Sequence, residues 1–280
     1  MNTKQHSLQR AGNSSSDRLG IGIDYGTSNS AAAIFDGTHV TVVNLEPHAK
    51  VMPSATYINR EYQIVTGQAA IDEYVSSNTG RTVELSAEIL GEGRTTTGQT
   101  GDHGLPEEAS TSLIYGQSLV DGGQQGRLFR GIKRLLGNNE SQRLMVFDKP
   151  FRLVALITPL LIRIRRTIEA QLPLGLNPTP VIDHACIGHP VNFEGSQNDR
   201  NRAALSALSE SYGYAEFNRQ SFYPEPNAAA LSYLYANPQL QTKTLLAVDF
   251  GGGTLDLCVI KHTNEDFEVV TTHGIGLGGD

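Results

Sequence analysis

The chain has 280 residues, of which 39% are hydrophobic, and a formal net charge of −7. This length allows one large domain or two ordinary ones with an ample core. Because the acidic balance argues against nonspecific nucleic-acid binding and against docking on an anionic membrane, we expect neither as a partner.

Residues 1–19 contain no apolar core, so we expect a disordered tail rather than a signal peptide. The two cysteines, Cys186 and Cys258, both fall in predicted strands and are interpreted as reduced thiols of a cytoplasmic protein. The longest apolar run, residues 153–162, is too short to span a bilayer.

Strands and one helix are predicted in the first quarter of the chain. The expected strands are 21–25, 30–35, 39–45, 51–58 and 62–65, and the expected helix is 67–75. Asp36-Gly37 is a typical two-residue hairpin connection. Residues 76–126 are rich in Gly, Thr, Ser and Gln and predict a flexible surface insertion.

A short basic amphipathic helix is predicted at 127–137, and the glycine at its end is typical of a helix C-terminus. A strand is predicted at 151–157, and Thr158-Pro159 is interpreted as the N-cap and first turn of a long helix. That helix carries several arginines, which could indicate an RNA or membrane surface. We favour a solvated helix face, since the protein is acidic.

The remaining elements alternate and then become a run of strands. They are a strand at 181–188, a helix at 197–212, a strand at 220–223, a helix at 226–236, and strands at 245–250, 254–261 and 267–272. The first half is therefore βββ, insertion, αβαβα, and the second half is βββ. The chain ends where the crossover helices of a second such unit would begin, so we expect its last strands to be exposed, disordered or paired with another copy.

Two stretches have the same pattern, an apolar strand, an aspartate, a glycine turn and a second strand. They are GIDYGTSNS at residues 22–30 and VDFGGGTLDL at residues 248–257. Successive glycines can present backbone N–H groups to an anion, and an aspartate at the strand end suits a hydrated Mg²⁺. The duplication predicts two related halves that hold one phosphorylated ligand between them.

These stretches, in this order of elements, resemble the phosphate loops of the actin-like ATPases. Their sequences most resemble those of the DnaK-type heat-shock chaperones (heat shock protein 70 family). Three further stretches resemble motifs of that family: FRGIKRLLG at 129–137, YPEPNAAAL at 223–231 and LGGD at 277–280. The diverged motif sequences and the long insertion are most similar to those of the YegD branch, whose members lack a peptide-binding domain.

The resemblance implies an α/β fold with an actin-like, ribonuclease H-like βββαβαβα lobe, a small inserted subdomain and only the start of a second lobe. The implied domains are a base at 20–46 and 150–242, an inserted subdomain at 47–149 with flexible 76–126, and the start of a truncated second lobe at 243–280.

The same resemblance implies a Mg²⁺-dependent ATPase that binds ATP or ADP and hydrolyses the γ-phosphate between the two hairpins. Asp24 and Asp249 are expected to hold Mg²⁺, mainly through water. Lys133, Glu225 and Thr254 are expected to be catalytic, and Asp256 to support its loop. The residues expected to bind the nucleotide are Gly26, Thr27, Ser28, Asn29, Gly251, Gly252, Gly253, Thr254, Gly278 and Gly279.

Each of these residues also has an ordinary structural interpretation. Asp24 and Asp249 could be turn aspartates, and Lys133 could belong to a solvated helix face. Glu225 could serve the helix dipole, although the following proline places it well at a helix start. The two glycine loops in the same chain favour the functional interpretation.

Pro190 and Arg202 match the family's interdomain relay, but His189, Asn192, Pro224 and Asn227 depart from the family pattern. Signalling to a second domain is therefore in doubt. Co-chaperones or nucleotide-exchange factors are implied as partners by the family, and a dimer through the incomplete second lobe is a further expectation.

Adenosine is held mainly by the second lobe in this family, so we expect this chain to bind nucleotide weakly or not at all and to turn over little. Two other functions remain open within the superfamily. One is a sugar or acetate kinase, against which the Glu-Pro motif and the Lys133 segment argue. The other is an actin-like protein whose filaments are controlled by ATP.

Overall fold

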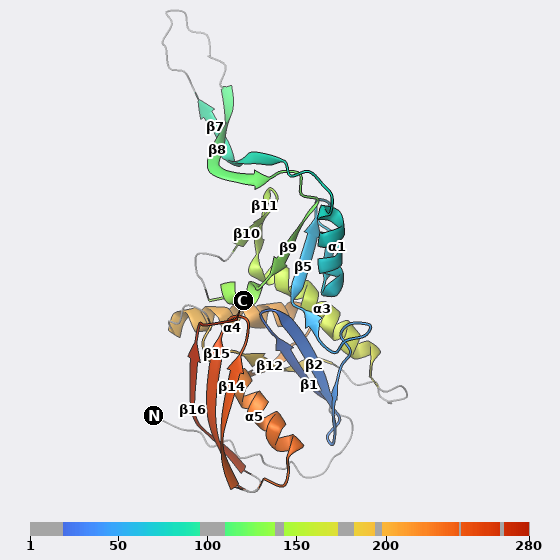
Figure 1. Cartoon of the computed structure of the whole chain (residues 1–280), viewed down its shortest axis with the longest axis vertical. Helices are drawn as coiled ribbons and strands as arrows, with labels where there is room; N and C mark the ends of the chain where they lie inside the picture. Colours follow the sequence, from blue (N-terminus) through green and yellow to red (C-terminus); the bar gives the residue numbers. More distant parts are fainter. Residues whose placement is uncertain are drawn as a thin grey trace, which may run out of the picture. The chain divides into compact units, whose positions relative to one another are not determined.

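The computed structural model is a mixed α/β protein, as predicted, and forms two compact units (Figure 1). It describes residues 19–95, 110–137, 143–172, 182–193, 198–240, 242–263 and 266–279. One unit comprises Met1–Tyr74 and Arg127–Asp280, and the other comprises Val75–Gly126. Within the described residues, the helices are too short or too polar to cross a membrane.

The larger unit is built on a six-stranded sheet in the order β13-β12-β1-β2-β3, in which β4 also pairs with β2. β1, β12 and β13 are parallel, whereas β2 runs antiparallel to its neighbours. Since parallel strands end at the same edge, this sheet brings the ends of three strands together. The strands are β1 (Gly20–Tyr25), β2 (Asn29–Phe35), β3 (Val40–Val42), β4 (Met52–Pro53), β12 (His184–His189) and β13 (Arg219–Pro224).

Helices α3 (Leu153–Ala170) and α4 (Asn198–Tyr214) share the main core with this sheet. The buried side chains of α3 recur at helical spacing from its first residue: Leu153, Val154, Leu156, Ile157, Leu160, Leu161, Ile164 and Ile168.

The predicted strand at 151–157 is therefore wrong, apart from its first two residues. Pro159 lies inside the helix rather than at its start, and Thr158 Oγ1 donates a hydrogen bond to the Val154 carbonyl rather than capping the helix. The continuous apolar stripe, buried against the sheet, outweighs the local effect of the proline.

A three-stranded sheet lies beside helix α1 (Gln68–Asn78), and its order is β6-β5-β9. Its strands are β5 (Ala55–Asn59), β6 (Ile64–Thr66) and β9 (Gly126–Arg130). The predicted helix at 127–137 is thus wrong in its first part, where Leu128 of β9 packs on the cluster of Ala55, Tyr57 and Ala70. Gly131, at φ 67°, separates β9 from the short helix α2 (Ile132–Leu135).

Two elements connect α2 to α3 and form a hairpin of their own. They are β10 (Arg143–Val146) and β11 (Lys149–Arg152), which pair antiparallel. Tyr62 stacks on Phe151 with a ring-centroid distance of 6.0 Å, and Lys149 Nζ lies 4.1 Å from the centre of the Tyr62 ring. These contacts fix the hairpin against the β5–β6 turn.

The last three strands form a separate antiparallel sheet, β14 (Thr242–Phe250), β15 (Leu255–Thr263) and β16 (Asp266–Ile275). Helix α5 (Glu225–Ala236) contacts strands of this sheet and also β12 and β13, so it lies between the two sheets (Figure 1). It covers one face of the sheet, where Ala230 packs with Cys258 and Ile260.

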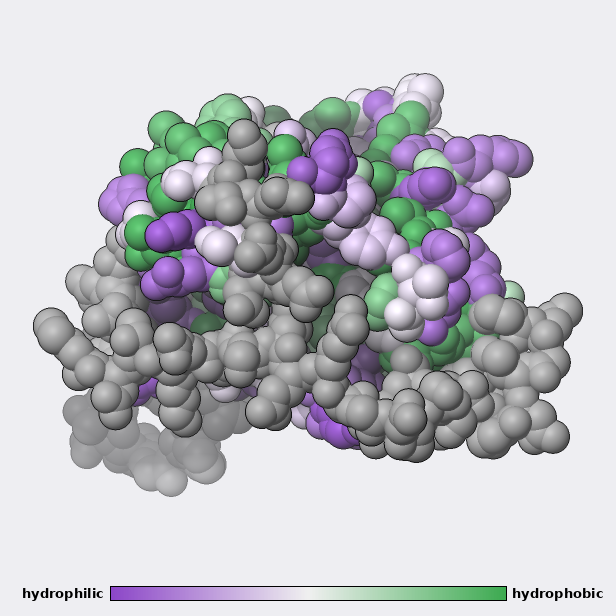
Figure 2. Space-filling view, turned by 90° about the horizontal axis from the view of Figure 1, so that it is seen from below, coloured by the Kyte–Doolittle hydropathy of each residue, from purple (hydrophilic) through white to green (hydrophobic). Residues whose placement is uncertain are grey.

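The other face of this sheet is exposed, which agrees with one of the outcomes expected for the last strands. Its exposed side chains include Leu246, Val248, Phe250, Val270 and Ile275, and Leu246 is 64% exposed. Figure 2 shows hydrophobic side chains reaching the surface at this end of the molecule. Pairing with a second copy stays a prediction.

The smaller unit contains an antiparallel pair where the sequence predicted an irregular insertion. β7 (Leu85–Thr95) and β8 (Ser110–Asp121) pair along their length, with two irregularities in register. Residues 96–109 lie outside the described residues, so the prediction of a flexible insertion is not tested there. Polar strands without a strict alternation are not distinguished from loops by hydrophobic pattern alone.

The first testable prediction concerns Gly67, which has φ +73° and no room for a side chain. A Cβ there would collide with the Glu46 carboxylate and the Arg163 guanidinium, whose Oε2 and Nη2 form an ion pair at 2.6 Å. We expect Gly67→Ala to lower the free energy of unfolding by about 3 kcal/mol, from backbone strain together with the clash. Urea titration followed by circular dichroism measures it.

Gly37→Ala is the matched control. Gly37 also has positive φ, at +96°, but a Cβ there would meet nothing within 4 Å. In Gly37→Ala, backbone strain alone should lower the free energy of unfolding, by about 1 kcal/mol. Equal losses in the two variants would contradict a steric role for the Glu46–Arg163 pair.

Candidate functional site

The first turn of the site joins β1 to β2 and contains Gly26, Thr27 and Ser28. Asp24 precedes it near the end of β1, where the strand pairs Asp24 with Ala31. A Cβ on Gly26 would overlap the Asn29 carbonyl oxygen, so the turn closes this tightly only with glycine. The sequence pattern therefore forms the strand–turn–strand unit that was predicted.

The second turn joins β14 to β15 and has the same form. Asp249 lies one residue before the end of β14, and the Gly251 amide donates to the Thr254 carbonyl at 2.9 Å. A Cβ on Gly253 would lie 3.0 Å from Thr27 Oγ1, so the two turns come close to each other. A side chain at position 253 would therefore crowd Thr27 of the first turn and also Arg134, whose Cγ is equally close.

Gly278 and Gly279 support the second turn rather than the cavity. The Gly279 amide donates to the Gly251 carbonyl at 3.0 Å, and a Cβ on Gly278 would overlap the Gly252 carbonyl. Both were expected to bind nucleotide. The structure places them against the backbone of the turn, where they help to fix its shape.

Lys133 and Glu225 form an ion pair that joins α2 to the first residue of α5. The Lys133 ammonium lies 2.5 Å from Glu225 Oε1, and the lysine is only 5% exposed. Gly188 of β12 leaves space for the glutamate, because a Cβ there would lie 3.1 Å from Glu225 Cγ. A buried ammonium needs such a partner, since desolvation without one is costly.

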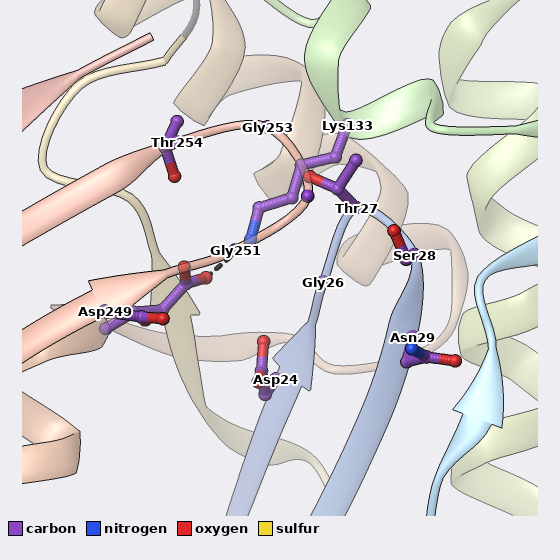
Figure 3. Close-up of a pocket in the computed structure, with 12 residues that line it drawn as sticks. Asp24, Gly26, Thr27, Ser28, Asn29, Lys133, Asp249, Gly251, Gly253 and Thr254 are labelled. Atoms are coloured by element: carbon purple, nitrogen blue, oxygen red, sulfur yellow. Dashed lines mark hydrogen bonds and ion pairs between the residues drawn. The ribbon is translucent and has the colours of Figure 1, made fainter. Parts of the chain in front are cut away.

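The β1–β2 turn, the β14–β15 turn, Lys133 of α2 and Glu225 of α5 all line one cavity of about 200 Å³. Figure 3 shows Lys133 extending between the two turns, with Asp24 on β1 and Asp249 on β14 below it, and Asn29 extending away from both Lys133 and Asp249. The lining residues are Asp24, Gly26, Thr27, Ser28, Asn29, Lys133, Glu225, Asp249, Gly251, Gly252, Gly253 and Thr254. Every one of them was predicted from the sequence as a site residue, and the structure brings them together although they span 230 positions.

The cavity carries three carboxylates and one ammonium. Desolvation by the surrounding protein raises the pKa of Asp24 to about 6, opposed by Lys133 and reinforced by Glu225 and Asp249, even though Asp24 remains open to the cavity. Desolvation likewise raises the pKa of Asp249, with further contributions from Glu225 and Asp256. The excess of negative charge favours a bound cation.

The donor set fits a cation that retains its water. Within the described part of the chain, no three His, Cys, Asp or Glu side chains converge as a ready-made metal site. Asp24 and Asp249 nevertheless both line the cavity and offer hard oxygens. Mg²⁺ usually keeps several waters and takes one or two carboxylates, together with phosphate oxygens.

Asp256 lies behind the second turn and is 1% exposed. Its Oδ1 accepts a hydrogen bond from the Val191 amide at 2.8 Å, and Thr254 also donates to it. Pro190 lines a small recess beside the main cavity, together with Lys133 and Thr254. Arg202 is exposed on α4 and lines neither the cavity nor this recess.

Sequence reasoning missed how the end of β12 and the loop after it contribute to the site. Gly188 accommodates Glu225, and His189, Val191 and Asn192 make contacts around Asp256 and Gly274. His189 was not among the predicted site residues. The departures of His189 and Asn192 from the family pattern were the available signal.

Comparisons with known proteins agree on one family. The Hsp70 protein family matches residues 136–280, just over half of the chain. The mitochondrial heat shock 70 kDa protein of Dictyostelium discoideum is 26% identical over 261 residues, which are 93% of this chain and 34% of that protein. The mitochondrial heat shock 70 kDa protein of Solanum tuberosum is 25% identical over 262 residues, 93% of this chain and 32% of that protein. The chain thus spans about a third of the length of these curated relatives.

The buried ion pair leads to the second testable prediction. Glu225→Gln leaves the Lys133 ammonium without its carboxylate, so we expect a loss of about 3 kcal/mol in the free energy of unfolding. The double variant Lys133→Met, Glu225→Gln should recover part of this loss. Urea unfolding of the four proteins in the cycle gives the coupling energy.

An exposed pair serves as the control. Arg152 and Glu210 form a two-pronged ion pair with 2.7 Å contacts, but their side chains are 53% and 34% exposed. Glu210→Gln should cost less than about 1 kcal/mol. A Glu225→Gln loss no larger than this would show that Lys133 does not depend on its partner.

The third testable prediction concerns the pH dependence of stability. Asp24 has a folded pKa above its unfolded value of 3.8, so its ionisation destabilises the fold increasingly as the pH rises from about 4 through about 6. Asp24→Asn removes this effect. Without added cations, the variant should therefore gain stability relative to wild type over this pH range, by about 1 kcal/mol, because water in the cavity screens the charge.

Asp183→Asn is a control of opposite sign. A hydrogen bond from Arg219 lowers the pKa of the exposed Asp183 carboxyl, which therefore contributes stability above its unfolded pKa and loses it as the pH falls. This variant should lose stability relative to wild type as the pH rises. Parallel curves for wild type and Asp24→Asn would show that the Asp24 pKa is not raised.

Proposed function

The chain belongs to the Hsp70 protein family, and from that premise we propose that it forms the Mg²⁺-dependent, ATP-hydrolysing region of a chaperone-type protein. Family membership supports nucleotide binding of the chaperone type. The proposal of ATP hydrolysis, and of the residues that carry it out, depends on the site. The YegD-like branch, a lobe divided as in the actin-like ATPases, and exchange factors as partners are further proposals that depend on the resemblance.

One observation carries the proposal. Two strand–glycine-turn–strand units from distant parts of the chain line a single polar cavity, and a buried Lys133–Glu225 pair lies in the same cavity. Glycine turns suit phosphate oxygens, and aspartates at the strand ends suit a divalent cation. A phosphate chain with its cation is the ligand class that uses both.

The two turns would bind the phosphates from opposite sides. Backbone amides at residues 26–28 and 252–254 are the proposed donors, since their side chains are small and these residues line the cavity, whereas the Gly251 amide closes its own turn. The close approach of Gly253 to Thr27 sets the spacing of the turns. A cavity of about 200 Å³ is smaller than the usual range for whole ligands of about 300–1,000 Å³, so it would take the phosphates rather than the nucleoside.

Asp24 and Asp249 would hold Mg²⁺, mainly through its waters. When bound, the ion would neutralise phosphate charge and help to align the groups that react. Holding the cation would require both carboxyls to be ionised. The pKa of Asp24, raised to about 6, leaves most of that carboxyl ionised at neutral pH.

Lys133, Glu225 and Thr254 are the proposed catalytic residues. The Lys133 ammonium would stabilise negative charge that develops on the terminal phosphate, and Glu225 would orient the attacking water or accept its proton. Their 2.5 Å contact holds both groups in place before a substrate arrives. Thr254 lines the cavity beside them, and its hydrogen bond to Asp256 sets its orientation.

The fourth testable prediction is a separation of binding from hydrolysis in Lys133→Ala. Titration calorimetry with Mg·ADP should give saturable binding, of millimolar affinity or tighter, in wild type and in the variant, because ADP lacks the terminal phosphate. Release of phosphate from Mg·ATP should fall by about 10²-fold or more in the variant. A product assay that separates free phosphate from a phosphorylated sugar identifies the acceptor as water.

Lys149→Ala is the matched control, since Lys149 is an exposed lysine that lies over the Tyr62 ring, remote from the cavity lining. It should hydrolyse ATP at the wild-type rate. Wild-type turnover in Lys133→Ala would remove the proposed role of this lysine. Failure of wild type to bind either nucleotide with Mg²⁺ would remove the proposed function.

A further inference from the structure

The peptide group between Pro190 and Val191 is held at both of its polar atoms by different parts of the fold. Its carbonyl oxygen lies 2.7 Å from His189 Nδ1, at the end of β12. Its amide donates at 2.8 Å to Asp256 Oδ1, on β15. Because a carbonyl oxygen can only accept, His189 must carry its proton on Nδ1.

Neighbouring contacts prevent this loop from moving independently. Asn192 Nδ2 donates to the Gly274 carbonyl of β16 at 3.1 Å, and Asn201 of α4 donates to Asn192 Oδ1 at 2.8 Å. A Cβ on Gly274 would lie 2.5 Å from Asp256 Oδ1, so the carboxylate packs directly on the β16 backbone. The loop therefore ties the six-stranded sheet to the β14–β16 sheet.

The same peptide borders the cavity. The Pro190 ring lines the recess shared with Lys133 and Thr254, and Thr254 donates to the carboxylate that holds the Val191 amide. A rotation of the peptide would release Asp256 and shift Pro190 against both residues. Its orientation therefore affects two of the groups proposed to act on the phosphate.

The imidazole is surrounded by groups that keep it in place. Glu225 on α5, Lys133 on α2 and Asp256 on β15 are close enough to influence its charge, and the Phe222 ring of β13 lies 6.3 Å from its own ring. Burial lowers the pKa of His189 below its usual value, which favours the neutral ring. The carbonyl contact requires a proton on Nδ1, so the neutral ring that burial favours is the Nδ1–H tautomer.

We propose that His189 is a positioning residue that fixes the Pro190–Val191 peptide, so that Asp256, Thr254 and Lys133 are held in register across the two sheets. The effect on hydrolysis rests on the proposed function. The effect on the peptide itself does not, and it can be measured without nucleotide.

The fifth testable prediction uses three proteins and two nuclear magnetic resonance measurements. The ¹⁵N spectrum of the wild-type imidazole should show His189 protonated on Nδ1 at neutral pH. In His189→Leu, which has no donor, the Val191 amide should exchange with solvent about tenfold faster. In His189→Asn, whose amide nitrogen takes the place of Nδ1, the exchange rate should remain within about twofold of wild type.

His184 on the same strand provides a matched control, because its Nε2 lies 3.0 Å from Ser221 Oγ instead. His184→Leu should leave Val191 exchange unchanged. A wild-type His189 protonated only on Nε2, or an unchanged Val191 rate in His189→Leu, would overturn the proposal, and the tautomer measurement holds even if the leucine variant fails to fold.

Steady-state hydrolysis links the peptide to the site. We expect His189→Leu to reduce kcat about tenfold with little change in KM, and His189→Asn to restore it, because the donor rather than the ring is required. Restoration by asparagine supports positioning, and equal losses in both variants contradict it. Absence of hydrolysis in wild type would contradict the proposed function, whereas the exchange rates would still decide the role of His189.

Discussion

The ion pair between Lys133 and Glu225 is the interaction on which the site depends. The ammonium is almost fully buried, and the only carboxylate within ion-pair distance among the described residues is that of Glu225. Its partner stands at the first residue of α5, the helix that contacts both sheets. The pair therefore places a cation between the two glycine turns and also fixes the start of the helix that joins the sheets, so the geometry of the cavity and the packing of the fold are linked.

Close backbone approach is the second constraint. The carbonyl of Asn29 leaves no room for a side chain on Gly26, and Gly253 meets Thr27 where the two turns approach each other. A larger residue at position 26 would open the first turn, and one at position 253 would push against the Thr27 and Arg134 side chains. The glycines therefore do more than permit turns, since Gly26 lets the first turn close tightly and Gly253 lets the second turn lie against the Thr27 side chain.

The candidate site could be predicted more completely than the fold around it. Strand, aspartate and glycine turn are adjacent in the chain, so local sequence specifies each loop. The start of α3 could not be predicted in this way, because Pro159 and Thr158 imitate a helix start while the deciding contacts of Leu153 and Ile157 are made with distant strands. The strand β9 was missed for the same reason, since Leu128 has a helical neighbourhood in sequence but packs on a sheet in space.

Contacts across the two sheets were beyond prediction, and they explain why the cavity has a defined width. Each sheet supplies one turn, so the distance between turns is set wherever the sheets are tied together. On one side the Val191 amide and the Asn192 side chain donate hydrogen bonds. On the other side Asp256 and the Gly274 carbonyl accept them. Asp256 belongs to the second loop motif, whereas Val191, Asn192 and Gly274 belong to neither loop motif. Their importance follows from topology, because β12 ends at the same edge as β1, beside the aspartate that faces the cavity.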